Sequence, residues 1–283
     1  MAMYNGFDFY AIEPASAARA EARVRRIIDG VKAAFVSGMD EQSRERKPYE
    51  VAGGVAIVRL SGLMVSSASW FDEADMSATG AALKAAATDP DVRSILLAVD
   101  SPGGEVTGTI GLADIAAAVN SVKPVTAHIA GVGASAAYWV SSQASSIIAS
   151  RMARIGSIGV AVVMYDTSAM AEAAGVRPVV VATSPLKVTG ADGVPITDEM
   201  TAEIKRTVEG YEAEFKAAIK TGRGIDPKTV ATGQTWFPKE AKALGLIDKI
   251  GSFDEALAAM MEKNNAAAKA RTAQARGRAA LLD

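Results

Sequence analysis

The sequence predicts an α/β fold with a mostly parallel sheet, βαβ crossovers and flanking helices, and three observations lead to it. Short apolar runs alternate with helical stretches through the middle of the 283-residue chain. These runs are continuous rather than alternating in polarity, which is typical of strands covered on both faces. Hydrophobic residues make up 49% of the chain and charged residues 22%, so a large apolar core is available.

The first half of the chain predicts three strands and three helices. Residues 14–36, rich in Ala, Arg and Glu, predict a helix, and the charged stretch 39–48 predicts a linker. Buried strands are expected at residues 55–60, 94–99 and 125–130. Helices between them are expected at residues 77–87 and 107–119, the first ended by Asp89-Pro90.

The second half predicts shorter elements and one long helix. A helix is expected to start in 135–142, followed by strands at 147–149, 160–164 and 179–182. Further helices are expected at 169–174, 197–220, 227–232 and 238–244. From Asn264 the chain turns low-complexity and predicts a frayed helix or a disordered tail. We therefore divide the chain into an N-terminal helix and linker (1–48), a central domain (49–262) and a tail (263–283).

Composition excludes several classes of function. The net charge is −2, so no general basic field is present to hold nucleic acid. The chain has no cysteine and one histidine, so thiolate and multi-histidine metal sites are excluded and no metal or cofactor is expected. Neither a signal-peptide pattern nor an apolar run of about 18 residues occurs. We therefore expect no membrane span and a soluble intracellular protein.

A glycine turn follows the predicted strand at 94–99. Residues 100–104 read Asp-Ser-Pro-Gly-Gly and lie at the carboxyl end of that strand, where open parallel sheets bind ligands. The N–H groups of Gly103 and Gly104 can approach a ligand closely because no Cβ intervenes. A plain strand-to-helix turn explains the same residues, and this segment alone does not decide between the two interpretations.

The segment 131–139 contains a candidate nucleophile. Ser135 follows a predicted strand and opens a helix, which suits either a helix N-cap or a nucleophile facing an oxyanion site. The nucleophile elbow of α/β-hydrolases places its histidine after the serine, but His128 precedes Ser135 on a buried strand. His128 is thus expected to be a core residue and the base a lysine. Spacing alone does not choose among Lys123, Lys187 and Lys205.

The same segment also fits a dinucleotide fingerprint. Gly131, Gly133 and Ala136 match the spacing G-x-G-x-x-A between a strand and a helix. Arg151 follows at the distance where an arginine could bind the 2′-phosphate of NADP. An NADP-binding oxidoreductase built on Gly131–Ala136 is therefore the alternative from another class, although the glycines at 103–104 would then have no role.

Four segments resemble the signal peptide peptidase A family, serine/lysine peptidases of the Clp protease/crotonase-like fold. They read DSPGG at 100–104, KPVTAHIAGVGASAAYWVSS at 123–142, RIGSIGV at 154–160 and TGQTWFPKEAKALGLIDKIGSFDEAL at 232–257. They occur in the family's order and span about 54–257. Where members usually carry A-S-G-G-Y, this chain has A-S-A-A-Y, which looks like the phage capsid-maturation branch of minor capsid protein C-like proteases.

The resemblance implies a role for each matching residue. These roles are Ser135 as nucleophile, Lys187 as general base, Ser157 as the group that orients the lysine amine, and the N–H groups of Ala136 and of Gly103 or Gly104 as the oxyanion hole. A lysine accepts a serine proton only when its amine is neutral, and burial in an apolar pocket favours that form. Acylation of the serine and hydrolysis of the acyl-enzyme would then complete the reaction.

Substrates, assembly and location also follow from the resemblance. It implies peptide or protein substrates, in the phage case scaffold or capsid proteins. It further implies a homo-oligomer, and a place in the bacterial host cytoplasm or the phage prohead. Two alternatives share the fold: a cellular peptidase that degrades signal peptides or proteins, and an inactive ring scaffold.

Overall fold

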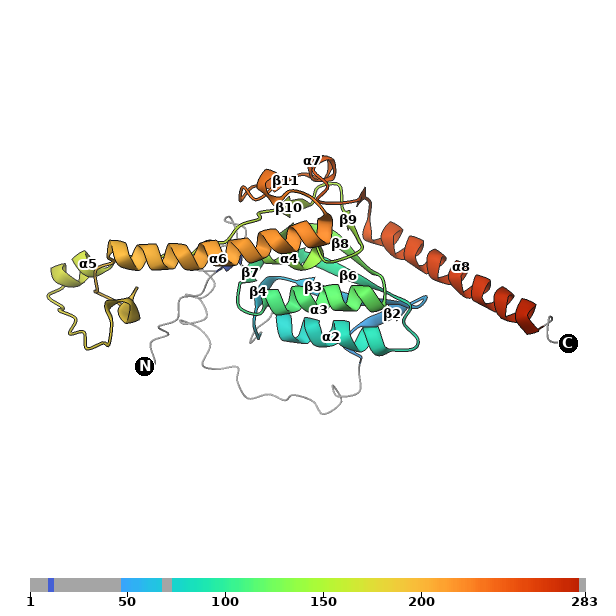
Figure 1. Ribbon diagram of the computed structural model, residues 1–283, viewed down its shortest axis with the longest axis horizontal. Coiled ribbons are helices and arrows are strands. Elements are labelled where there is room, and N and C mark those ends of the chain that lie inside the picture. The colour runs from blue at the N-terminus through green and yellow to red at the C-terminus, as the bar shows by residue number, and fades with distance from the viewer. Residues whose placement is uncertain (1–9, 13–46, 68–72, 280–283) are drawn as a thin grey trace.

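The computed structural model describes residues 10–12, 47–67 and 73–279. The helix expected at 14–36 lies outside the described residues, as does the expected linker up to residue 46 (Figure 1). The described chain forms a sheet-centred body, an arm to one side and a long C-terminal helix to the other.

The body is built on an eight-stranded, mostly parallel sheet. Its strands are β2 (Glu50–Ala52), β3 (Val55–Ser61), β6 (Ser94–Ser101), β8 (Val125–Ala134), β9 (Ser146–Ala149), β10 (Arg154–Gly156), β11 (Thr235–Trp236) and β12 (Lys249–Ile250). They run in the order β11-β10-β8-β6-β3-β2, with β9 beside β8 and β12 beside β9. Among the described strands, the antiparallel pairs of this sheet are β2–β3 and β10–β11. The predicted α/β class with a mostly parallel sheet is therefore confirmed.

A second, smaller sheet lies beside the carboxyl end of β6. Its strands are β1 (Tyr10–Ile12), β4 (Leu63–Val65), β5 (Glu73–Asp75) and β7 (Gly103–Glu105), in the order β1-β7-β4-β5. β7 continues almost directly from β6 and contains both glycines of the predicted turn. The sequence did not predict this sheet, because strands of three residues carry too little periodicity to be recognised.

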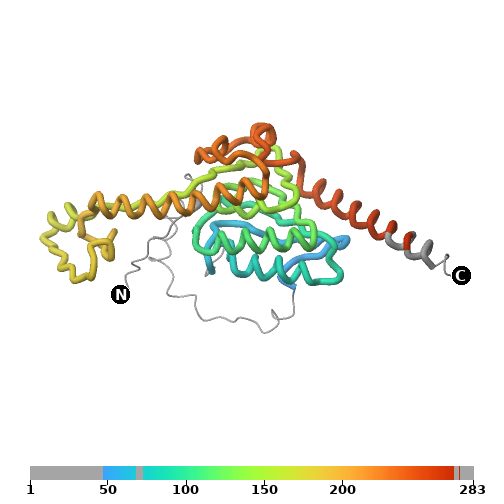
Figure 2. The backbone as a smooth tube through the Cα atoms, in the orientation of Figure 1, coloured from blue at the N-terminus to red at the C-terminus, as the bar shows by residue number. Residues whose placement is uncertain are grey.

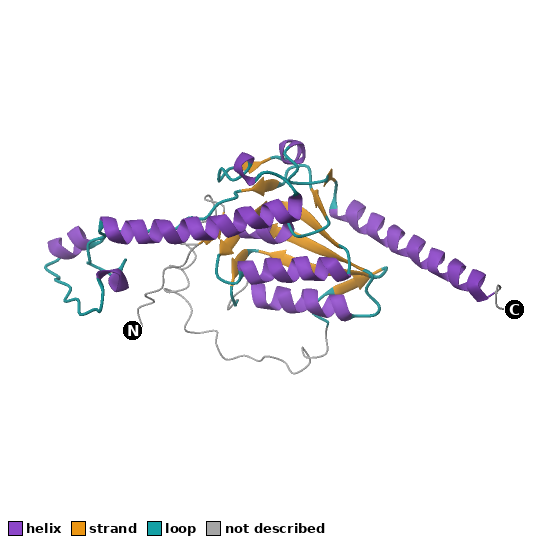
Figure 3. Ribbon diagram, in the orientation of Figure 1, coloured by secondary structure: helices purple, strands orange, loops and turns teal. Residues whose placement is uncertain are grey.

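Helices pack against the strands of the large sheet (Figure 3). Helices α2 (Met76–Thr88) and α3 (Thr109–Val122) pack together, and their Leu83 and Leu112 join the core cluster that contains Leu97 of β6. Because side chains alternate along a strand, the residues on either side of Leu97 point to the opposite face of the sheet. On that side His128 of β8 packs edge-on against Phe253 of helix α8 (Phe253–Ala279), with ring centroids 5.6 Å apart.

Two further helices pack against each other, and the longer one leads from the arm back to the body. Helix α4 (Ala136–Ser141) follows β8 directly, and the long helix α6 (Asp198–Arg223) crosses it. Trp139 of α4 stacks on Phe215 of α6, with ring centroids 4.5 Å apart and an interplanar angle of 5°. Both aromatic rings are fully or almost fully buried, so this contact fixes the C-terminal half of α6 to the body.

The arm comprises residues 161–197 and lies at the N-terminal end of α6, away from the sheet (Figure 2). It holds the short helix α5 (Ser168–Ala173) and the 3₁₀ turn η2 (Pro185–Val188). The strands predicted at 160–164 and 179–182 are wrong, since neither segment pairs as a strand of either sheet. Their β-branched residues favour strands only where a partner and a covering face exist, and in these two segments pairing is limited to an isolated bridge at Ala161.

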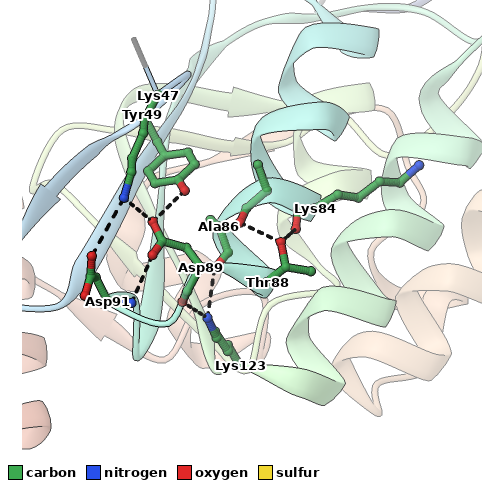
Figure 4. Close-up of polar contacts among 9 residues, drawn as sticks. Lys47, Tyr49, Lys84, Ala86, Thr88, Asp89, Asp91 and Lys123 are labelled. Atoms are coloured by element: carbon green, nitrogen blue, oxygen red, sulfur yellow. Dashed lines mark hydrogen bonds and ion pairs between the residues drawn. The ribbon is translucent and has the colours of Figure 1, made fainter. Parts of the chain in front are cut away.

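A polar cluster holds the start of the body to the end of α2 (Figure 4). Lys47 Nζ and the Tyr49 hydroxyl donate to the Asp89 carboxylate over 2.6 and 2.8 Å, and the Asp91 N–H donates over 2.9 Å. The ammonium of Lys123 donates to the Asp89 carbonyl over 2.6 Å. Hydrogen bonds from Lys47 first, then from the Asp91 N–H and Tyr49, lower the pKa of Asp89 to about 2.

The C-terminal helix α8 crosses the boundary that we expected at 262–263. Within the described residues the chain is helical from Phe253 to Ala279, which corresponds to the helical one of the two alternatives expected from Asn264. The Asn264 amide donates to the Gly54 carbonyl over 3.2 Å and to Ser94 Oγ over 3.0 Å. The sequence did not reveal that Asn264 holds the helix to the body, because the contact is made by one buried amide and not by an apolar stripe. No helix in the described part of the chain is long and apolar enough to cross a bilayer.

Candidate active site

Ser135 sits on a strained turn between the central strand and a helix. It lies between the last residue of β8 and the first residue of α4, with φ 54° and ψ −123°. Its N–H donates to the Gly156 carbonyl over 2.7 Å. A left-handed backbone is costly for a residue with a Cβ and is concentrated at functional sites in proteins. The small residues Ala134 and Ala136 on either side leave room for this turn.

The hydroxyl of Ser135 is buried and unsatisfied. The residue is 1% exposed, and within the described residues Ser135 Oγ has no hydrogen-bond partner. A buried hydroxyl without a partner costs about 1–3 kcal/mol. It therefore requires a functional explanation, and a nucleophile awaiting its substrate and base supplies one.

Ser157 occupies the equivalent position on the neighbouring strand. β8 and β10 run parallel with Ala134 opposite Gly156, so Ser135 and Ser157 both follow immediately after paired residues. Ser157 has φ 51°, and its N–H donates to the Gln234 carbonyl over 2.7 Å. Among described non-glycine residues, only these two serines have a positive φ. The structure thus brings the candidate nucleophile and the serine expected to support the base to one place.

The glycine turn reaches the same place from β6. Ser101 is opposite Gly133 in the parallel pairing of β6 and β8, and Gly103 lies two residues after Ser101. The Gly103 N–H donates to Ser101 Oγ over 3.2 Å, and Ser101 is fully buried. A Cβ on Gly104 would lie 1.9 Å from the Met64 carbonyl oxygen, so only glycine fits there.

The remaining candidate donor is the amide of Ala136. It begins α4, and the first N–H groups of a helix have no acceptor within the helix. Ala136 is fully buried and adjoins Ser135, which is where the amide following a nucleophile serves an oxyanion. The small sheet contributes through β7, which contacts α4.

Lys187 lies elsewhere. It belongs to η2 on the arm, its side chain is exposed, and η2 packs on α6. The arm lies at the end of α6 remote from the body, whereas the opposite end of α6 contacts α4 (Figure 1). Within one chain the structure therefore leaves Ser135 and Lys187 apart.

His128 behaves as the buried histidine that the sequence predicts. It is 1% exposed, and its Nε2 lies 3.2 Å from the Gly251 carbonyl oxygen. Burial lowers the pKa of His128, and the hydrogen bond to Gly251 opposes this only in part. With its ring against α8, His128 is not placed to serve Ser135.

The dinucleotide alternative does not fit the geometry. Gly131 and Gly133 lie inside β8, so no glycine-rich turn is present to receive a pyrophosphate. A Cβ on Gly131 would lie 2.7 Å from Asp100 Oδ1, and the same carboxylate oxygen accepts the Val132 N–H over 2.9 Å. A carboxylate at this position repels phosphate. The described residues also contain no cluster of side chains that could hold a metal ion.

Sequence reasoning missed two residues that shape the site. Ser101 holds the Gly103 amide, and Asp100 fixes the β8 backbone before Ser135. Both belong to the Asp-Ser-Pro-Gly-Gly segment, where only the glycines were considered, so the signal was present. Glu105, which directly follows that turn, accepts hydrogen bonds from the N–H and Oγ of Ser66 over 2.8 and 2.7 Å.

Comparison with known proteins adds an independent finding. The model of Peptidase family S49 matches residues 117–267. Protease 4 of Salmonella typhi is 31% identical over 226 residues, which cover 77% of this chain and 36% of that protein. Capsid assembly protease C of Escherichia phage lambda is 30% identical over 234 residues, covering 80% and 53%. Head-tail preconnector protein GP5 of Enterobacteria phage P21 is 27% identical over 224 residues, covering 77% and 44%.

The chain spans between about a third and a half of the length of these relatives. Among solved structures, an enoyl-CoA hydratase/isomerase family member superposes with a TM-score of 0.42 at 19% identity, over 77% of this chain and 74% of that one. This likeness is too weak to add to the fold described above.

Proposed function

The chain belongs to peptidase family S49, and from that premise we propose that it is a serine endopeptidase with Ser135 as its nucleophile. The observation that carries the proposal is the state of Ser135: strained backbone, buried hydroxyl and no hydrogen-bond partner among the described residues. A structural serine would relax its backbone or satisfy its hydroxyl. Strain and an unmet hydroxyl together favour a group held ready for reaction.

The surroundings of Ser135 suit acyl transfer. Attack of Oγ on a peptide carbonyl places negative charge on the carbonyl oxygen, which needs preorganised donors. The amides of Ala136 and of Gly103 or Gly104 are assigned to that role. The acyl-enzyme is then cleaved by water, and both steps need a base that first takes the serine proton and later the proton of the water.

The general base is assigned to Lys187 of a second copy of this chain. Within one chain Lys187 is exposed on the arm, and Ser135 Oγ has no partner among the described residues. Insertion of the arm into a neighbouring copy would bury the amine beside Ser135 and Ser157.

The composition of the arm supports this docking. Between residues 161 and 197 only Gly193 is buried, so the segment has no core of its own. Large apolar side chains are nevertheless abundant there, with exposed fractions of 67% for Val163, 69% for Tyr165, 68% for Met170, 60% for Val176, 82% for Val179, 47% for Val180 and 95% for Val181. Apolar surface of this kind marks an interaction site.

We assign the substrate class to peptides and proteins and, in a phage setting, to scaffold or capsid proteins. Support comes from two similar proteins, whose names refer to capsid assembly and to the head-tail preconnector. A cellular role is the second candidate, because Protease 4 of Salmonella typhi shows similar identity. An inactive ring scaffold is disfavoured by the retained strain at Ser135.

Active-site labelling tests the nucleophile. A fluorophosphonate probe should modify the full chain at Ser135, identified by peptide mapping, and should leave Ser135→Ala unlabelled. Label elsewhere, or equal labelling of the variant, would reject the assignment.

Mixing two inactive variants tests the shared site. Ser135→Ala keeps a functional lysine, and Lys187→Ala keeps a functional serine. If neighbouring copies share each site, equimolar reassembly should restore about a quarter of the wild-type turnover. Half of the sites carry an intact serine, and half of these face a neighbour with an intact lysine. Mixtures as inactive as their components would place the base within the same chain or at another residue.

A further inference from the structure

The N-terminal strand β1 pairs with the strand that contains the glycine turn. β1 runs antiparallel to β7, with Ile12 opposite Gly103, Ala11 opposite Gly104 and Tyr10 opposite Glu105. The other side of β7 pairs with β4 at Met64. β1 (dark blue in Figure 1) therefore fills the edge of β7 that the rest of the small sheet leaves open.

That edge begins next to the candidate nucleophile. The pairing of β6 with β8 ends at Ser101 opposite Gly133, and each chain then leaves the strand, so that Gly103 and Ser135 both lie two residues beyond this last pair. β7 also contacts α4, the helix that Ser135 opens. An extended chain added to β7 at Gly103 thus lies at the end of β7 nearest in sequence to the turn, on the strand that contacts the helix opened by Ser135.

The direction of β1 is that of a substrate. A peptide that binds a strand edge is held mainly by its backbone, so any extended segment can take the place. The step from Tyr10 to Ile12 leads from Glu105 back to Gly103, towards Ser135. A peptide that bound through the residues preceding its scissile bond, antiparallel to β7, would run the same way.

The chain length allows β1 to leave this edge without disturbing the body. The body is anchored from Lys47 onwards by its hydrogen bond to Asp89, and 34 residues, 13–46, separate that anchor from β1. β1 remains covalently attached to the body through these residues, so its return to the edge is intramolecular. Three paired residues give few hydrogen bonds, so a substrate can compete.

We infer that residues 10–12 are a tethered occupant of the peptide-binding edge of β7, which a substrate must displace before Ser135 can react. The inference rests on the proposed function for its consequence in catalysis. The occupant is identified by its backbone pairing alone, and its inhibition is competitive: it raises KM and leaves kcat unchanged.

Two truncations that differ by three residues test this inference. A chain starting at Glu13 lacks β1, and a chain starting at Tyr10 retains it. For a fluorogenic peptide, the chain starting at Glu13 should show a several-fold lower KM and unchanged kcat, and the chain starting at Tyr10 should match the full chain. Equal KM values for the two truncations, or lost turnover with unchanged thermal stability in the chain starting at Glu13, would overturn the inference.

A binding measurement separates this inference from the proposed function. A labelled peptide of residues 6–15 should bind the Ser135→Ala chain starting at Glu13 and should bind the full-length Ser135→Ala chain several-fold more weakly. The same peptide with prolines at positions 11 and 12 should not bind, because N–H groups alternate in direction and one of the two must face β7. Equal binding of both peptides would overturn the inference. Absence of Ser135-dependent turnover in every chain would reject the proposed function, with peptide binding still deciding the occupant.

Discussion

The body around Ser135 and the arm that carries Lys187 are stabilised in opposite ways. In the body, Ser135 and Ser157 are held with positive φ by two parallel strands, a buried core and main-chain hydrogen bonds of 2.7 Å each. In the arm, the carboxylate of Asp166 accepts hydrogen bonds from the N–H groups of Ser168 and Ile196 over 2.9 and 3.0 Å. Within the described part of the chain, no buried core packs against these residues. A strained backbone conformation persists only where the surrounding packing enforces it. The body can therefore hold a serine with a positive φ, and the arm cannot.

The largest expected effect is at Ser135. Ser135→Ala should lower kcat on the order of 10⁶-fold, as removal of a nucleophile does in other serine peptidases. Because Ser135 Oγ has no hydrogen-bond partner among the described residues, its removal should leave the free energy of unfolding unchanged or slightly higher. Peptide turnover and urea unfolding measure the two effects. Retained turnover would contradict the role of Ser135 as nucleophile, and a clear loss of stability would contradict an unsatisfied hydroxyl.

Lys187 should affect activity alone. Lys187→Arg should lower kcat about 10²–10⁴-fold, the usual contribution of a general base, because a guanidinium stays protonated and cannot accept the serine proton. The side chain is exposed in the arm, so thermal stability should not change. Lys205→Arg, on the exposed side of α6, is the matched control and should remain active. An active Lys187→Arg variant would remove the arm from the catalytic scheme.

The aromatic contact between α4 and α6 joins the two regions. Phe215 is fully buried and stacks on Trp139, so Phe215→Ala should destabilise the protein by about 3–5 kcal/mol. Phe237→Ala serves as control because that ring is 44% exposed and lies 4.8 Å from the Arg154 guanidinium. It should cost about 1 kcal/mol or less. Similar losses for both variants in urea unfolding would show that α6 is not fixed to the body by this stack.

Two glycines of α6 test whether the helix contacts the body at one of its ends. A Cβ on Gly222 would lie 2.1 Å from the Ser142 carbonyl oxygen, whereas a Cβ on Gly210 would meet nothing within 4 Å. Gly222→Ala should therefore destabilise by about 1–3 kcal/mol through overpacking. Gly210→Ala should stabilise by about 0.5–1 kcal/mol, because alanine favours the helix. Effects of the same sign on the unfolding midpoint would contradict the contact between α6 and the body.

The smallest expected effect concerns acid stability at the start of the body. The pKa of Asp89 is lowered to about 2 in the folded protein, so the unfolded state binds more protons between about pH 4 and 2. The stabilisation is complete above the unfolded pKa and is lost as the pH falls towards 2. Asp89→Asn should lose this part of the pH dependence, and Glu203→Gln on exposed α6 should keep it. Unfolding curves at several pH values compare the two variants.

The sequence alone determined the elements that depend on local pattern. Continuous apolar runs predicted β3, β6 and β8, and the helical stretches between and after them predicted α2, α3 and α6, because each signal is carried by neighbouring residues. The glycine turn and the serine segment were also recognisable, because each directly follows a predicted strand and matches a motif of the peptidase family that the chain resembles. These features share one property: the reason for them lies within a few residues of chain.

Only the tertiary structure decided the features that depend on distant partners. The β-branched residues at 179–182 remain unpaired because no strand lies beside them, while the short strand β1 forms because β7 offers it an edge. The strain at Ser135 and Ser157 arises from the pairing of β8 with β10, which no local pattern records. The separation of Lys187 from Ser135 follows from the direction of α6. In each case contacts between residues far apart in the chain outweigh local preference, because a strand or a reactive turn exists only where another element holds it.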